Sequence, residues 1–148
     1  MFEINKIIEG SHIVISDVEY QVLGKTFYVT EKAPDDSYVK ILLNDHYVLV
    51  VSPSDCIAYF GKNEGCLTAF DGHPQFVIYD GLKYEMVNHD YQIVKCIEFG
   101  FPLDIEGEVE FWDYEVDDMI ISVAVTSREK SRADVVARYI SLDQIFVM

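Results

Sequence analysis

The 148-residue sequence is poor in basic residues, with 11 Lys and Arg against 26 Asp and Glu and a formal net charge of −15 at pH 7. Such a charge repels phosphate backbones and anionic lipid head groups. It therefore argues against direct binding of nucleic acid and against membrane partners. Cysteine is also scarce: Cys56, Cys66 and Cys96 are odd in number and form no Cys-x-x-Cys pair. The sequence therefore predicts neither a disulfide framework nor a zinc site.

Long apolar runs are missing as well. No window approaches the roughly 20 apolar residues that a membrane helix needs. The N-terminus carries acidic residues within its first ten positions and has no apolar stretch followed by a small-residue cleavage site, as a signal peptide would. We therefore expect a soluble, cytoplasmic protein with reduced thiols and no membrane insertion.

Helical periodicity is scarce, and the aromatic residues are ten Tyr and nine Phe against one Trp. Alternating apolar runs separated by turn residues predominate, which predicts an all-β, mostly antiparallel fold with little helix. Gly24-Lys25 and Asn88-His89-Asp90 are interpreted as turns between strands. The expected strands are 12–16, 20–23, 26–29, 38–43, 46–52, 56–60, 75–79, 82–87, 91–99, 109–116, 119–126, 135–140 and 144–147.

An internal similarity divides the single domain (1–148) into a half-unit 1–60, a joint 61–75 and a half-unit 76–148. Placing Tyr20 on Tyr84 aligns the apolar positions of 12–30 with those of 76–94 without a gap. Two half-units with similar apolar faces can pack together as a sandwich or a barrel. The seam between them is then the expected place for a pocket.

The most unusual stretch runs from residue 98 to 118, with nine acidic residues, no Lys or Arg, and several aromatic residues between them. One interpretation is a docking face for a basic protein, on which carboxylates steer association and aromatic rings anchor it. The candidate partner-binding residues are Trp112, Asp113, Tyr114, Glu115 and Asp117. The other interpretation is an ordinary alternating strand whose acids face water. It places Glu106, Glu108 and Glu110 outside and Ile105, Val109 and Phe111 inside.

Signatures of chemistry are missing. Asp113, Glu115, Asp117 and Asp118 could be read as a divalent-metal site, but alternation separates them and no calcium-binding loop is present. His89-Asp90 could orient an imidazole as a base, although these residue types are common in turns. We predict no catalytic residue, no metal ligand and no cofactor.

The basic residues Arg128, Lys130 and Arg132 form one cluster. They are interpreted as a solvated loop that could also meet the acidic face of a second copy and form a homodimer.

Three segments carry a family resemblance: Tyr20-Gln21-Val22, Asp80-Gly81-Leu82-Lys83-Tyr84 and Trp112-Asp113-Tyr114-Glu115. Their order resembles an uncharacterised bacterial family known only as a domain of unknown function. The resemblance implies a genomic context of membrane-stress and polyamine-related genes, and it supplies no catalytic residues.

The leading hypothesis is a non-enzymatic binding or accessory module of a bacterial cytosol with a protein partner. One alternative is an acidic immunity-like or nucleic-acid-mimicking inhibitor of a basic protein. The other is a small-molecule-binding β domain with its pocket at the seam.

Overall fold

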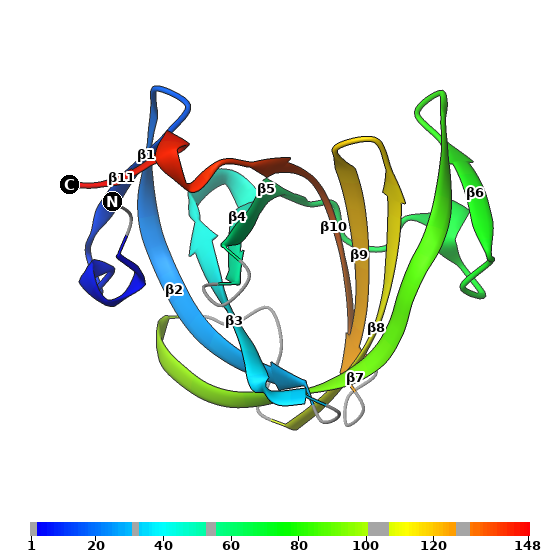
Figure 1. Cartoon of the computed structure of the whole chain (residues 1–148), viewed down its shortest axis with the longest axis horizontal. Helices are drawn as coiled ribbons and strands as arrows, with labels where there is room; N and C mark the ends of the chain where they lie inside the picture. Colours follow the sequence, from blue (N-terminus) through cyan, green and yellow to red (C-terminus); the bar gives the residue numbers. More distant parts are fainter. Residues whose placement is uncertain (1–2, 31–32, 53–55, 101–106, 127–130) are drawn as a thin grey trace.

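The computed structural model describes residues 3–30, 33–52, 56–100, 107–126 and 131–148. These residues form one antiparallel sheet of 11 strands, which confirms the predicted all-β class (Figure 1). Four short 3-10 helices, η1 (Ile4–Lys6), η2 (Asn44–His46), η3 (Thr68–Phe70) and η4 (Leu142–Gln144), are the only helices among the described residues. The strands are β1 (His12–Ile15), β2 (Val18–Thr30), β3 (Ala33–Leu43), β4 (Tyr47–Ser52), β5 (Ile57–Asn63), β6 (Phe76–Tyr79), β7 (Leu82–Gly100), β8 (Gly107–Val116), β9 (Met119–Thr126), β10 (Arg132–Ile140) and β11 (Ile145–Val147).

The sheet closes on itself. Its order is β11-β1-β2-β3-β4-β5-β10-β9-β8-β7-β6, and an additional pairing joins β2 to β7. Strands β2 to β5 and β7 to β10 therefore form a continuous ring, with β1, β11 and β6 outside it. The fold is barrel-like. β2 and β7 cross at the bottom of Figure 1, and the remaining strands of each half rise on either side.

The two half-units enter the ring through equivalent hairpins. Ile13 pairs with Tyr20 in the first, and Val77 pairs with Tyr84 in the second, so the two registers coincide at the offset chosen from the sequence. Both loops are two residues long with positive φ at each position, as in type I′ turns. Val29 also pairs with Ile93, its own counterpart, where β2 meets β7. Descent of the halves from one ancestral unit stays a prediction.

The turns predicted at Gly24-Lys25 and at 88–90 are wrong, because β2 and β7 each run through these positions as one long strand. A register shift stands in place of each turn: between Val22 and Gly24 in the pairing with β3, and between Met86 and Asn88 in the pairing with β8. Such irregularities bend a strand without ending it. At the crossing, a Cβ on Gly100 would lie 1.9 Å from the backbone oxygen of Leu23, so this close approach requires glycine.

Both faces of the sheet are buried. The face inside the ring carries apolar residues of both halves, including Val48 and Val50 of β4, Ile120 of β9 and Ala137 of β10. The outer face of each half has its own core. In the first half β1, β11 and η1 (Ile4–Lys6) cover it, and in the second η3 (Thr68–Phe70) and β6 do so.

Buried charges fix the covering segments. The Lys25 ammonium, 2% exposed, donates to the backbone oxygens of Ile4 and Ile7, each at 3.1 Å, and so holds η1 against β2. In the second half the Arg132 guanidinium binds both carboxylate oxygens of the fully buried Asp134, at 2.8 and 2.7 Å, and also the Asp71 carboxylate. Arg132 thus ties the joint to β10, and its predicted place in a solvated loop is wrong. Arg128 and Lys130 lie outside the described residues.

Strand β9 shows the consequence of two-sided burial. The alternation of Ile121, Val123 and Val125 predicts one buried and one wet face, yet all of Ile120–Ala124 is buried. Ile121 and Val123 face the outer core of the second half, and Ile120 faces the inside of the ring. Ile120–Ala124 therefore have no solvent-exposed face, because the face predicted to meet water packs inside the ring.

We expect Val123→Asp to destabilise the protein by at least about 3 kcal/mol, because it places an unpaired carboxylate among apolar side chains. Val18→Asp is the matched control: Val18 is 51% exposed, so its replacement should change stability by less than about 0.5 kcal/mol. Denaturant unfolding of the two variants measures both values. Equal stabilities would contradict the facing of β9.

Candidate functional site

The turn between β3 and β4 borders a concave feature of the surface. It is the 3-10 turn η2 (Asn44–His46), and Asp45 and His46 both adopt left-handed conformations, with φ of 60° and 66°. Non-glycine residues rarely adopt this conformation, although Asn, Asp and His tolerate it best. The Asn44 side chain anchors the turn, since its Oδ1 accepts the Gln21 N–H at 2.8 Å and its Nδ2 donates to Asp45.

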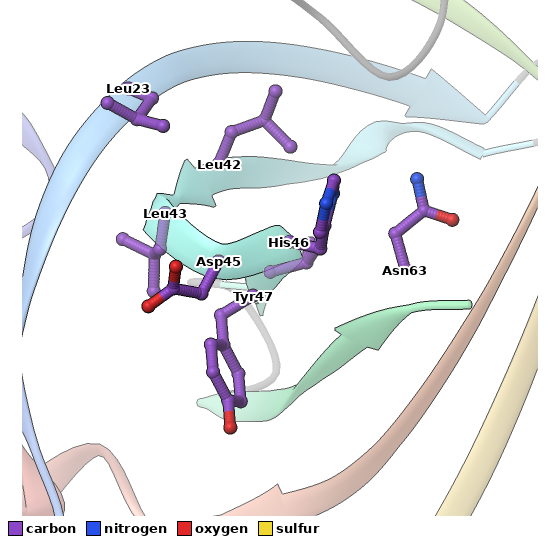
Figure 2. A pocket seen from close by; sticks show the side chains of 8 residues that line it. Leu23, Leu42, Leu43, Asp45, His46, Tyr47 and Asn63 are labelled. Carbon is purple, nitrogen blue, oxygen red and sulfur yellow. The ribbon is translucent and has the colours of Figure 1, made fainter. Parts of the chain in front are cut away.

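A cleft of about 350 Å³ opens beside this turn, at the end of the ring. Figure 2 shows the His46 ring between Leu42 and Asn63, with Asp45 and Tyr47 on the other side of the turn. Leu42 and Val48 also pack in the apolar cluster inside the ring, so the floor of the cleft continues into that core. The lining residues are Leu23, Leu42, Leu43, Asp45, His46, Tyr47, Val48 and Asn63.

An aromatic cluster supports the Tyr47 wall of the cleft. The Tyr47 ring stacks on Phe60 at 5.2 Å between centroids and meets Tyr20 edge-on at 5.1 Å. The Lys62 ammonium lies 4.9 Å from the Tyr47 centroid, which adds a cation–π contact. Burial raises the pKa of Tyr20, and neighbouring Tyr47 and Asp45 raise it further against the opposing charge of Arg138. The wall is therefore packed before any ligand arrives.

Several polar side chains lie on the face of the sheet that points into the ring. Lys40, 4% exposed, has its ammonium 4.8 Å from the centroid of Tyr28, which stacks on Tyr38. On the opposite half, the Tyr139 hydroxyl donates a short hydrogen bond to the Glu115 carboxylate. Burial raises the pKa of Tyr139 strongly, and the Glu115 hydrogen bond adds to the effect.

Asp113 belongs to this inner group. Burial raises the pKa of its carboxyl to about 6, against the opposing effects of a hydrogen bond from Ser122, the Lys40 charge and a hydrogen bond from Asn88. The Lys40 charge, supplied by the other half-unit, opposes this rise without outweighing burial, so the charged form of Asp113 is disfavoured inside the ring.

The structure corrects the exposure of the predicted partner-binding residues. Trp112 and Tyr114 are buried in the outer core of the second half, while Asp113 and Glu115 are partly buried on the other side of β8. Only Asp117, in the β8–β9 turn, is exposed. The five residues therefore do not form one exposed face. Protein binding by this segment stays a prediction.

The alternative interpretation of the acidic stretch is right for Val109 and Phe111, which are buried, and for Glu108, which is exposed. Glu110 is partly buried. Burial raises its pKa, but hydrogen bonds from His89 and Tyr91 outweigh this effect, so the net shift is downward. Ile105 and Glu106 lie outside the described residues.

Two histidines enclose Trp112. His73 stacks on the indole at 3.3 Å and His89 at 4.5 Å between ring centroids. Burial and the Arg132 charge lower the pKa of His73, and its Nδ1 has no hydrogen-bond partner in the described part of the chain. His89 bonds Glu110 at 2.8 Å. These side chains complete a packed layer around the indole, and His89 lies in β7 rather than in the predicted turn.

Other candidate chemistry can be placed as well. Within the described ranges, no group of three or more His, Cys, Asp or Glu side chains is arranged to hold a metal ion, and no helix is long and apolar enough to cross a membrane. Cys56 and Cys66 are exposed and form no disulfide within the described ranges. The Cys96 side chain lies outside the described part.

The comparisons with known proteins add nothing to the fold class that the structure shows. No family model matches the chain, and no similar curated protein or solved structure was found. The resemblance to an uncharacterised bacterial family therefore stays a prediction. The class that the structure defines is an all-β domain with a closed antiparallel ring.

Sequence reasoning missed the cleft. Its lining residues all come from positions 23–63, on β2 to β5 and the turn η2, and none comes from the second half-unit, so the cleft does not lie at the predicted seam. The available signal was Asn44-Asp45-His46, three residues that tolerate left-handed backbone between two apolar strands. This signal marks a turn, but it does not show that the turn borders a hollow.

The Asp113 carboxyl should titrate near pH 6 in the folded protein, where its ordinary value is 3.8. A raised pKa means that the folded state holds the proton more tightly than the unfolded state does. Relative to Asp113→Asn, the wild type should therefore lose stability as the pH rises from about 4 to about 7, by on the order of 2 kcal/mol.

Carbon-13 NMR of the labelled carboxyl and denaturant unfolding across this range measure the titration and the stability. A carboxyl midpoint near the ordinary aspartate value would show that Asp113 is not buried inside the ring.

Proposed function

We propose that this chain is a non-catalytic binding module whose cleft beside η2 holds a small, mainly apolar molecule. The cleft of about 350 Å³ at the end of the ring carries this proposal. Ligand sites in proteins are concave, mostly apolar, and often located at the mouths of β-barrels. The volume falls within the ordinary range for such sites.

The lining residues suggest the chemistry of the ligand. Leu23, Leu42 and Val48 offer apolar surface, whereas Asp45, His46 and Asn63 bring a carboxylate, an imidazole and a carboxamide to the rim. The described residues give His46 no side-chain hydrogen-bond partner, so its ring nitrogens are available to a ligand. The fitting ligand is an apolar body with one hydrogen-bonding head group.

The backbone supports binding rather than chemistry. The left-handed conformations of Asp45 and His46 set the shape of the turn that borders the cleft. The anchored Asn44 and the packed Tyr47 wall hold the cleft open in one shape. General-base catalysis would require a partner that orients the His46 imidazole. The described residues give His46 no such side-chain partner, so the rim favours binding over catalysis.

Fluorescence of the neutral probe N-phenyl-1-naphthylamine tests the cleft, because its emission increases in an apolar site. We expect saturable binding to one site. Leu42→Trp should weaken the binding at least about tenfold by filling the hollow, and His46→Ala should weaken it less by removing one polar contact.

Leu82→Trp is the control, because Leu82 is 39% exposed and lies outside the cleft. Thermal melts of all variants verify that the fold is retained. Binding that Leu42→Trp leaves unchanged while the fold is intact would overturn the proposal.

The acidic character favours a second hypothesis, inhibition of a basic protein. Its support is the net charge of −15, which steers a basic partner toward the surface over a screening distance of about 10 Å in ordinary salt. This hypothesis concerns the surface and is independent of the cleft.

A further inference from the structure

The two equivalent hairpins differ in what covers their outer edge. In the first, the Val22 N–H bonds the Ser11 oxygen, so the alternation of an antiparallel ladder directs the backbone groups of His12 and Val14 away from β2. Strand β11 pairs with these outward backbone groups. Val14 pairs with Phe146, and the Met148 N–H donates to the His12 oxygen at 2.9 Å.

The second hairpin repeats this arrangement without the covering strand. The Met86 N–H bonds the Gln75 oxygen, so the backbone groups of Phe76 and Ile78 point away from β7. β6 is the last strand of the sheet, and the described residues provide no strand beyond it. Figure 1 shows β6 on the outer right of the molecule, whereas β1 on the left has β11 beside it.

The uncovered edge is also apolar. Phe76 is 58% and Ile78 70% exposed, while Val77 and Tyr79 face the core of the second half. An exposed apolar edge strand is a template for pairing with another chain, and proteins usually protect such edges. Val14, the counterpart of Ile78, is only partly exposed next to Phe146.

The charge around β6 is negative. Lys83 lies over the Phe76 ring and pairs with Glu85 at 3.7 Å, which neutralises both groups. Burial raises the pKa of Tyr79, and the carboxylates of Glu64 and Asp80 raise it further, so both acids act on this strand. With a net charge of −15, two copies of the chain repel each other.

We propose that the outer edge of β6 is the docking site for one extended segment of a basic partner protein. The segment adds a strand antiparallel to β6, as β11 does to β1. It places an apolar side chain opposite Ile78 and carries Lys or Arg at its ends. Main-chain hydrogen bonds to Phe76 and Ile78 supply the pairing, and charge selects the partner.

The peptide Lys-Lys-Gln-Ile-Phe-Val-Met-Lys-Lys, which copies residues 144–148 between lysines, is the probe. Fluorescence anisotropy with the full chain should show saturable binding. N-methylation of its Phe, whose N–H faces the edge, should weaken binding at least about tenfold, and N-methylation of its Val should not. The peptide flanked by Glu should bind at least about tenfold more weakly than the probe.

The variant Ile78→Pro removes the outward N–H at a position where an edge strand tolerates proline. It should abolish binding, while Ile78→Val should retain it. Because Ile78→Pro leaves β1 and β11 intact, undiminished binding by this folded variant would show that the peptide displaces β11 instead, and would overturn the proposal. Equal effects of the two N-methyl groups on the wild type would overturn it as well, without any variant having to fold.

Discussion

The pairing of β2 with β7 is the interaction on which the rest of the structure depends. Each strand uses the first part of one edge for its own hairpin partner and the second part of the same edge for the other half-unit. This sharing closes the ring and leaves the two hairpins outside it. Glycine at position 100 allows the close approach of the two backbones at the crossing.

Closure also decides where polar groups can lie. A strand of an open sheet could send the acids of β8 to water, but in the ring Asp113 and Glu115 turn toward the inside. There the Lys40 charge from the first half acts on Asp113, and the Tyr139 hydroxyl donates to Glu115. Because both faces of the sheet are then buried, the short covering segments require anchors of their own, which Lys25 and Arg132 provide.

The sequence predicted the features that depend on neighbouring residues. Alternation and turn residues identified the strand class and the β9 limits, and the offset between Tyr20 and Tyr84 matched the register of both hairpins. The features it missed are non-local. Trp112 and Tyr114 resembled surface anchors because nothing in their segment shows that residues 67–79 cover them. The cleft likewise combines positions from five elements, β2, β3, η2, β4 and β5, which strand pairing brings together.

Two hairpins of matching register lie outside the ring, and among the described residues only the first has its outer edge paired. Amide hydrogen exchange measures this directly, since unpaired amides on a sheet edge exchange quickly and paired ones slowly. The account predicts strong protection of the Val14 amide beside β11, and fast exchange at Ile78, its counterpart on β6. Equal protection at Val14 and Ile78 would show that the edge of β6 is already covered, and would contradict the account.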